Sequence, residues 1–384
     1  MTHPYVRPVL DPRVAAVVWD EGSAGAAARA MLAQDARWIA DAMLSAQSGE
    51  GWLPLVLLGH SARIVYEGSI ALRSANPAVG VPELAQTLES RHDDVIARSR
   101  HGGKFLDDNR KSFDDLRAEM LGFYDAHRDE FMGNALWFAR WLESDVGIFL
   151  APGERILGTT IALHFRTGLG KEVHISDAGP VLLSVAQAQG EALATFAVLG
   201  GDESTLTATI DYEGLGRLGE KDRRVIRYLR DRYDPGMDVA TKLLLLMVEG
   251  EVNTTDQVVP LGSSTHPEAT FRARLISVFH SLRAVDEILI SQPSAASLGT
   301  QRVRSLLSEQ ATRRVLDNPQ LRRVRNRCMH YEIRDRSIDL DLTRPMFGIV
   351  EGLCPESTFD ELDAELRGLS SRLGDALHHW RTRS

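Results

Sequence analysis

The hydrophobic positions of the chain mostly follow the repeat of an α-helix. Apolar residues recur every three or four positions, which places them on one face of a helix. Before residue 260 this pattern covers residues 24–47, 111–144, 180–200, 220–234 and 237–252. The segment 180–200 is apolar on several sides, and a helix of that kind is usually buried. We therefore expect a mostly helical region here, with 180–200 inside it.

Strand patterns are few and short. Polar and apolar residues alternate over 204–213, as they do in an edge strand, and more weakly over 337–342. No internal repeat and no low-complexity tract is present. The pattern of the whole chain predicts a mainly α fold with a few short strands.

A segment rich in proline, glycine, serine and threonine separates two groups of helices. It covers residues 253–270, and Pro267 within it suits the first turn of a new helix. We therefore predict a linker at this point and divide the chain into a mostly helical N-terminal region, a helical middle region with a short strand segment, the linker and a C-terminal bundle. Their predicted bounds are 1–105, 106–252, 253–267 and 268–384.

The C-terminal region has the pattern of a four-helix bundle. Its second and fourth helices cover 300–316 and 358–380. The third begins at Asn318 and Pro319, a capping residue followed by a proline suited to the first helical position. The first helix carries one apolar stripe, which consists of Phe271, Leu275, Val278, Phe279, Leu282, Val285 and Leu289.

The composition is that of an ordinary soluble protein. Of 384 residues, 43% are hydrophobic and 25% are charged. The longest apolar runs are too short to span a bilayer, and the first residues lack the apolar core of a signal peptide. Cys328 and Cys354 are the only cysteines, and they have no metal-binding spacing. We expect a cytoplasmic protein that does not enter a membrane and has no metal site.

Charge is distributed unevenly along the chain. The net charge is −9, yet residues 261–384 hold 18 arginines and no lysine against 16 acidic residues, a local charge of +2. Such asymmetry indicates that the C-terminal part meets an anion, although arginine is also the default cation of this chain. The overall acidity argues against indiscriminate binding of nucleic acid.

Three further motifs resemble functional sequences but lack the required context. Ser61 lies in a run like a hydrolase nucleophile elbow, but Arg63 stands where the elbow needs a small residue. The glycines of 214–219 follow a polar segment rather than a buried parallel strand. The His-Asp pair in 91–94 has no further ligand candidates. We expect a glycine turn at 214–219 and a solvated helix face at 91–94.

The segment 321–335 carries five arginines around one histidine. Within it, Arg325 is followed directly by Asn326 and, five positions on, by His330 and then Tyr331. With its helical context, this arrangement resembles the R-x4-6-H signature of the HEPN superfamily, which are small helical bundles with many ribonuclease members. The resemblance covers about residues 265–384. It implies a HEPN-like four-helix bundle, while residues 1–260 lie outside it.

Arginine and histidine suit the cleavage of RNA by its own 2′-hydroxyl. Histidine exchanges protons near neutral pH, and arginine offers a charged planar fork to two phosphate oxygens. The resemblance implies a cofactor-free, metal-independent endoribonuclease with Arg325 and His330 as catalytic residues, and products with 2′,3′-cyclic phosphate ends. It also implies a homodimer. By analogy, such proteins serve as toxins or anti-phage effectors, in some cases with an antitoxin partner.

The spacing of the motif adds a geometric constraint. Five positions place Arg325 and His330 about 140° apart around an ideal helix. They would meet one phosphate only if the helix bends or ends near His330, or if a partner subunit completes the site. The weaker candidates are supporting residues on the motif and on the first bundle helix, and RNA-binding residues beside the motif. They are Asn326, Asp286, Glu287 and Ser281 as supporting residues, and Arg322, Arg323, Arg327 and Tyr331 as RNA-binding residues.

Two readings other than an enzyme stay open at this point. The same arginines would also serve a non-catalytic HEPN-like module that binds a nucleotide or a protein. Alternatively, the motif is accidental and the bundle is a helical scaffold. An accidental motif would leave Arg325 and His330 away from any groove.

Overall fold

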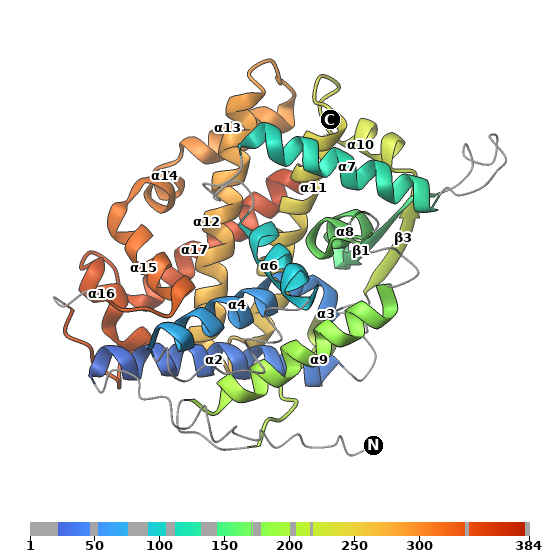
Figure 1. The fold of residues 1–384 in the computed structure, drawn as a ribbon. Helices are drawn as coiled ribbons and strands as arrows, with labels where there is room; N and C mark the ends of the chain where they lie inside the picture. Colours follow the sequence, from blue (N-terminus) through green and yellow to red (C-terminus); the bar gives the residue numbers. More distant parts are fainter. Residues whose placement is uncertain are drawn as a thin grey trace.

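A computed structural model describes most of the chain and shows a mainly helical protein with one small sheet (Figure 1). This confirms the predicted fold class. The described residues are 22–46, 53–75, 91–104, 112–131, 144–169, 171, 178–199, 205–215, 218–334 and 338–380.

The helices before residue 200 form one packed group. In this group α4 contacts α2, α6 and α9, and α6 also contacts α8. The predicted helix 24–47 is confirmed as α2, and only the first part of 111–144, as α7, falls within the described residues. The bounds are α2 (Ser23–Ala46), α3 (Leu53–Val56), α4 (Leu58–Ala75), α6 (Arg91–Gly103), α7 (Phe113–Phe131), α8 (Thr160–Thr167) and α9 (Ala178–Ala197).

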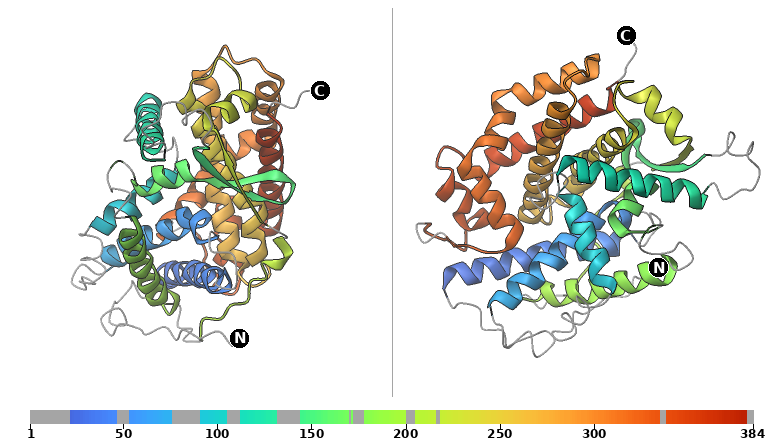
Figure 2. Two further views of the ribbon diagram at one scale, coloured as in Figure 1. Left: turned by 90° about the vertical axis from the view of Figure 1, so that its right-hand side faces the viewer. Right: turned by 45° about the horizontal axis from the view of Figure 1, so that its top comes forward.

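The C-terminal helices pack around the long helix α12, which runs through the middle of the molecule (Figure 1). Helix α12 contacts α11, α13, α14, α15 and α17, and Figure 2 shows α17 running beside it. The predicted apolar stripe of α12 is buried over its whole length. The bounds are α10 (Val225–Arg232), α11 (Val239–Asn253), α12 (Pro267–Ser291), α13 (Leu298–Ser308), α14 (Gln310–Asp317), α15 (Pro319–His330), α16 (Ile349–Leu353) and α17 (Phe359–His378).

A three-stranded antiparallel sheet joins the two groups of helices. Its order is β2-β1-β3, with bounds β1 (Val146–Ala151), β2 (Arg155–Thr159) and β3 (Gly219–Arg223). The central strand β1 is buried at every residue. Helix α11 packs against β2, where a Cβ at Gly250 would lie 3.1 Å from the carbonyl oxygen of Leu157. Glycine at this position therefore lets the helix approach the strand closely.

The segment predicted as a linker is helical and packed. Helix α11 continues into a π-helical turn, η6 (Thr254–Val258), and a 3-10 turn, η7 (Val259–Gly262). The Asn253 amide donates to the Ile156 carbonyl at 2.9 Å, and the Thr254 hydroxyl donates to the Leu157 carbonyl at 3.3 Å. These bonds hold the segment against β2, and one hydrophobic core extends across it. Pro267 does begin α12, as expected. The domain boundaries themselves stay predictions.

Two predicted strands are wrong, and one predicted burial is incomplete. Described residues of 205–213 form no strand, because the Asp41 carboxylate accepts the backbone N–H groups of Thr209 and Ile210 and holds this segment on α2. Residues 338–342 form no strand either. Helix α9 lies on the surface, with Leu183 64% exposed. The alternation of polar and apolar residues did not show that the described residues of the two segments form no strand, and the hydrophobicity of 180–200 did not show that α9 lies on the surface.

Two findings on the described residues concern the cysteines and the apolar helices. Cys328 and Cys354 are both buried free thiols, and burial raises the pKa of the Cys328 thiol to about 12. In the described part of the chain, no helix has the length and apolar character needed to cross a membrane.

A buried network of four charged or polar side chains ties the two regions together. The Asp35 carboxylate on α2 accepts from Arg63 on α4 at 2.8 Å and from Arg272 on α12 at 2.8 Å. The Tyr331 hydroxyl donates to the same carboxylate at 2.7 Å. Burial alone would raise the pKa of Asp35, but the two arginines outweigh it and hold the pKa below its usual value. The carboxylate therefore stays charged in the core.

Replacing Asp35 should strongly destabilise the fold. Asp35→Asn leaves Arg63 and Arg272 buried without their counter-charge, and breaking a buried pair costs about 3–5 kcal/mol of unfolding free energy. Urea denaturation measures this loss. Asp231→Asn, which breaks an exposed ion pair with Arg227 on α10, is the control and should cost less than about 1 kcal/mol. An equal, small loss in both variants would contradict the expectation.

Acid should also destabilise the protein. Burial lowers the pKa of His60 and of His164 from 6.5 to about 4. The unfolded chain therefore takes up protons that the folded chain excludes as the pH falls through this range. Stability is complete above pH 6.5 and declines between pH 6.5 and about 4. Denaturation curves over this range measure the decline, which His164→Gln should make shallower. An unchanged slope in that variant would exclude His164 as a cause.

Candidate functional site

The motif helix α15 has defined ends. Its N-cap Asn318 accepts from the backbone N–H groups of Gln320 and Leu321 at 2.8 and 3.3 Å. The helix ends at His330, because Tyr331 adopts a left-handed conformation with φ of 50°. The predicted start of the helix at Asn318 and Pro319 is confirmed, and its end at His330 is one of the conditions under which Arg325 and His330 could share a phosphate. The chain therefore turns immediately after the histidine and exposes its imidazole at the end of the helix.

Arg325 and His330 point into different surroundings. Arg325 is buried, 7% exposed, and its guanidinium carbon lies 4.2 Å from the centroid of the Phe279 ring on α12. The His330 imidazole is 41% exposed and faces a surface groove. Arg325 is not among the residues that line this groove. The structure thus does not bring the two predicted catalytic side chains together.

His330 is instead paired with a carboxylate from the N-terminal region. Its Nδ1 lies 2.8 Å from Oε2 of Glu67 on α4, and the Arg100 Nε on α6 donates to Glu67 Oε1 at 2.6 Å. Burial alone would raise the pKa of Glu67, but the hydrogen bond from His330 and the charge of Arg100 outweigh it and lower that pKa. An ionised Glu67 can only accept. Nδ1 of His330 therefore carries the proton, and Nε2 is left as the second ring nitrogen on the groove side.

The groove has a volume of about 770 Å³ and lies between α2, α4 and the end of α15. Its α15 side is polar and includes Asn326, Arg327 and His330. Its α2 and α4 side carries Glu67 and is otherwise lined by small or apolar residues, and the chain after α15 completes the groove. The remaining lining residues are Ala24, Gly25, Ala28, Glu67, Ile70, Ala71, Tyr331, Glu332, Ile333 and Arg334. This volume is in the range of small-molecule sites.

Tyr331 takes part in the core rather than in the exposed part of the groove. Its ring is 2% exposed, and its hydroxyl binds Asp35 and accepts from Arg63 at 3.0 Å. Burial raises the pKa of this hydroxyl well above its ordinary value. A nucleobase cannot stack on a ring in this position. Tyr331 therefore fixes the end of α15 instead of contacting RNA.

The candidates on α12 lie away from the groove. Ser281 is fully buried, and its hydroxyl has no hydrogen-bond partner among the described atoms. Asp286 accepts from Arg313 on α14 at 3.1 Å, and Glu287 pairs with Arg283 at 3.0 Å. Since none of these three residues lines the groove, none faces His330 across it.

The arginines beside the motif divide between the groove and other surfaces. Arg327 and Asn326 are half-buried in the groove wall. Arg322 is exposed outside it, and Arg323 donates to Gln320 at 2.8 Å. Of the predicted RNA-binding arginines, only Arg327 therefore shares a surface with His330.

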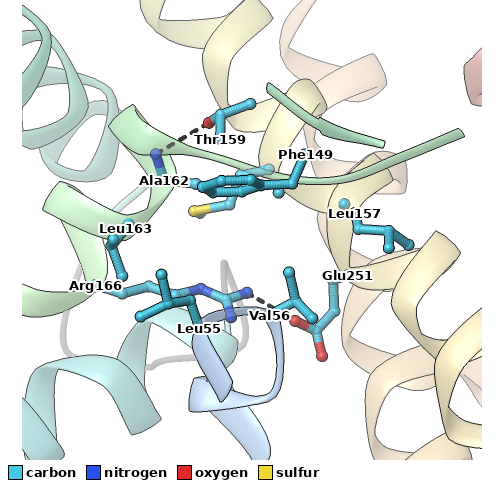
Figure 3. Close-up of a pocket in the computed structure, with 12 residues that line it drawn as sticks. Leu55, Val56, Phe149, Leu157, Thr159, Ala162, Leu163, Arg166 and Glu251 are labelled. Carbon is cyan, nitrogen blue, oxygen red and sulfur yellow. Dashed lines mark hydrogen bonds and ion pairs between the residues drawn. The ribbon is translucent and has the colours of Figure 1, made fainter. Parts of the chain in front are cut away.

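Two other hollows lack a comparable group. One, of about 30 Å³, has mainly apolar walls and an Arg166–Glu251 ion pair of 2.7 Å at its floor (Figure 3). That volume holds about one or two water molecules. The other, of about 390 Å³ beside α10, is lined by Arg223, Arg224 and Arg227 together with two aspartates. Neither lining includes a histidine, and the described residues contain no group of three or more potential metal ligands among His, Cys, Asp and Glu.

Sequence reasoning missed Glu67 and Arg100. Glu67 is the one acidic residue of α4 and lies among Ile64, Val65, Tyr66 and Ile70. A carboxylate in such a stretch is costly to bury unless it is paired, so it signals a buried ion pair or a site. The sequence gives no indication, however, that its partner is a histidine 263 positions away.

Glu67 should fix the tautomer of His330. In the wild type the neutral imidazole carries its proton on Nδ1, whereas Glu67→Gln removes the charge that enforces this form. ¹⁵N NMR of the labelled imidazole distinguishes the two tautomers. Glu332→Gln, which alters a carboxylate elsewhere on the groove, is the control and should leave the His330 signals unchanged. An Nε2–H imidazole in the wild type would contradict the assignment.

Comparisons with known proteins assign no family to this chain. No family model, no curated protein and no solved structure matches it. The likeness to the HEPN superfamily therefore rests on the motif and helix order of residues 265–384 alone.

Proposed function

We propose that this chain is a metal-independent endoribonuclease of the HEPN type in which His330 performs proton transfer. The observation that carries the proposal is the Arg100–Glu67–His330 chain of contacts, which holds an exposed imidazole at the edge of a groove. A buried carboxylate that orients an exposed imidazole is a common arrangement for general acid–base catalysis. Arg327 in the same wall supplies positive charge.

The reaction follows from these groups. Nε2 of His330 takes the proton of a ribose 2′-hydroxyl, and the 2′-oxygen attacks the adjacent phosphorus. The bond from phosphorus to the 5′-oxygen breaks, and that oxygen leaves with a proton from solvent or from the imidazolium. The products are a 2′,3′-cyclic phosphate and a 5′-hydroxyl. Arg327 is placed to stabilise the charge of the phosphorane, because a guanidinium keeps its charge and offers paired donors.

Arg325 has a supporting role in this proposal. Its guanidinium stacks on Phe279 beneath the helix surface and does not line the groove. The contact anchors α15 to α12 and so helps to fix the position of His330 one turn later. Arg325 is therefore a positioning residue, and its replacement is expected to reduce stability as well as cleavage.

The buried Arg325 favours one alternative function. A HEPN-like module whose motif arginine does not reach the groove would bind a nucleotide there without cleaving it. In that case His330 and Arg327 would contact a phosphate without breaking a bond. The two functions differ in the products and not in the site.

Wider biological roles follow from the resemblance only. They include a homodimer, an antitoxin or regulatory partner, and toxin or anti-phage activity in the cytoplasm. Light scattering on the purified protein would measure the oligomeric state. The geometry around His330 depends on α4, α6 and α15 of one chain.

Cleavage of RNA should depend on His330 and not on added metal. We expect His330→Ala to lower the cleavage rate of a labelled RNA by a factor of about 10²–10⁴, the usual contribution of general acid–base catalysis. A chelator should leave the wild-type rate unchanged, and mass spectrometry should detect cyclic phosphate ends.

His379→Ala is the matched control. His379 is an exposed histidine directly after α17, and it does not line the groove. It should cut RNA like the wild type. Equal cleavage by His330→Ala and the wild type would exclude His330 as the catalytic base. Binding of a nucleotide by the wild type without any cleavage would favour the alternative module.

A further inference from the structure

The two walls of the groove differ in chemistry. On the α15 side, His330 and Arg327 present an imidazole and a guanidinium. On the α4 side, Ile70 is 39% exposed, one of the few large apolar side chains with so much exposed surface among the described residues. Ile333, half-buried, lies in the same lining. An exposed isoleucine inside a hollow marks a surface that a ligand would remove from water.

The position of Ile70 on its helix brings it next to the Glu67–His330 pair. Residues three apart on a helix are neighbours on one face, so Ile70 follows Glu67 along the groove. Ala71 of α4 and Ala28 of α2 border the same wall. Their short side chains leave space beside Ile70 for a flat group.

We infer, building on the proposed function, that this apolar wall is a subsite for one nucleobase. A nucleotide has the same division as the groove, since a flat aromatic base with weakly polar faces is joined through ribose to an anionic phosphate. With the phosphate at Arg327 and His330, the base lies against Ile70 and Ile333. Contact with the face of a base depends little on its identity, so the subsite accepts more than one base.

The subsite also assigns a role to the N-terminal region. Ile70, Ala71 and Ala28 all come from α2 and α4, outside the part of the chain that resembles HEPN proteins. The C-terminal bundle contributes the proton-transfer group, and the N-terminal helices contribute the surface on which the base lies. The base must be unpaired to present its face to this wall, because a base within a duplex is already stacked.

The test separates binding from cleavage. The probe is a fluorescent single-stranded RNA in which every 2′-hydroxyl is methylated, so that it cannot be cut, and anisotropy measures its dissociation constant. Ile70→Asp should weaken binding about tenfold or more, and Ile70→Ala about threefold, as expected when one side chain loses its apolar contact. Circular dichroism verifies that each variant is folded.

Two controls make the result specific to a base. Ile290→Asp changes an isoleucine that is 71% exposed at the end of α12, outside the groove, and should leave binding unchanged. A probe with the same backbone but without bases should bind the wild type more weakly and should not distinguish the uncharged variant Ile70→Ala from the wild type. Equal binding of both probes, or of Ile70→Asp and the wild type, would overturn the subsite.

The experiments distinguish a failure of the proposed nuclease function from a failure of the proposed base subsite. If unmodified RNA is cut through His330 while Ile70→Asp binds the methylated probe normally, the subsite is wrong and the nuclease function stands. If Ile70 governs binding but no RNA is cut, the groove is a nucleotide site without catalysis. A free mononucleotide that competes with the probe at equal affinity would identify the ligand as a nucleotide and not an RNA strand.

Discussion

The Asp35 carboxylate has no exposed surface, and Arg63 on α4, Arg272 on α12 and Tyr331 directly after α15 converge on it. Desolvation of these charges is costly, so the network is favourable only when all partners are in place. It joins α2 and α4 to α12 and to the residue directly after α15. Because Tyr331 is held there in a left-handed conformation, α15 must end at His330. The location of the candidate site therefore depends on a buried ion pair in the core.

The contacts of Glu67 with Arg100 and His330 connect the core network to the surface groove. Glu67 lies one turn beyond Arg63 on α4, and it binds both Arg100 and His330. Thus one face of α4 contributes first to the core network and then to the groove. The N-terminal helices are in this way part of the site and not a separate appendage. A nuclease of this kind would need both regions folded together, since neither one alone holds the imidazole.

Arg325 illustrates how a sequence motif and a site can separate. The motif pairs it with His330, but the helix rotates the two side chains apart, and the aromatic ring of Phe279 offers the guanidinium a favourable buried position. Arg327, two positions later, lies on the groove side. Of these two arginines, only Arg325 has the spacing of the R-x4-6-H signature, whereas Arg327, which lines the groove, is separated from His330 by two residues.

The sequence by itself determined the helical character, the apolar stripe of α12, the start of α12 at Pro267 and the start of α15 at Asn318 and Pro319. These features depend on local periodicity, capping and proline geometry, which neighbouring residues encode. Only the tertiary structure decided that 205–213 is not a strand, that 253–262 is packed against β2, and that His330 meets Glu67 rather than Arg325. Each of these depends on contacts between residues far apart in the chain. No local sequence pattern specifies which buried carboxylate pairs with which histidine or arginine.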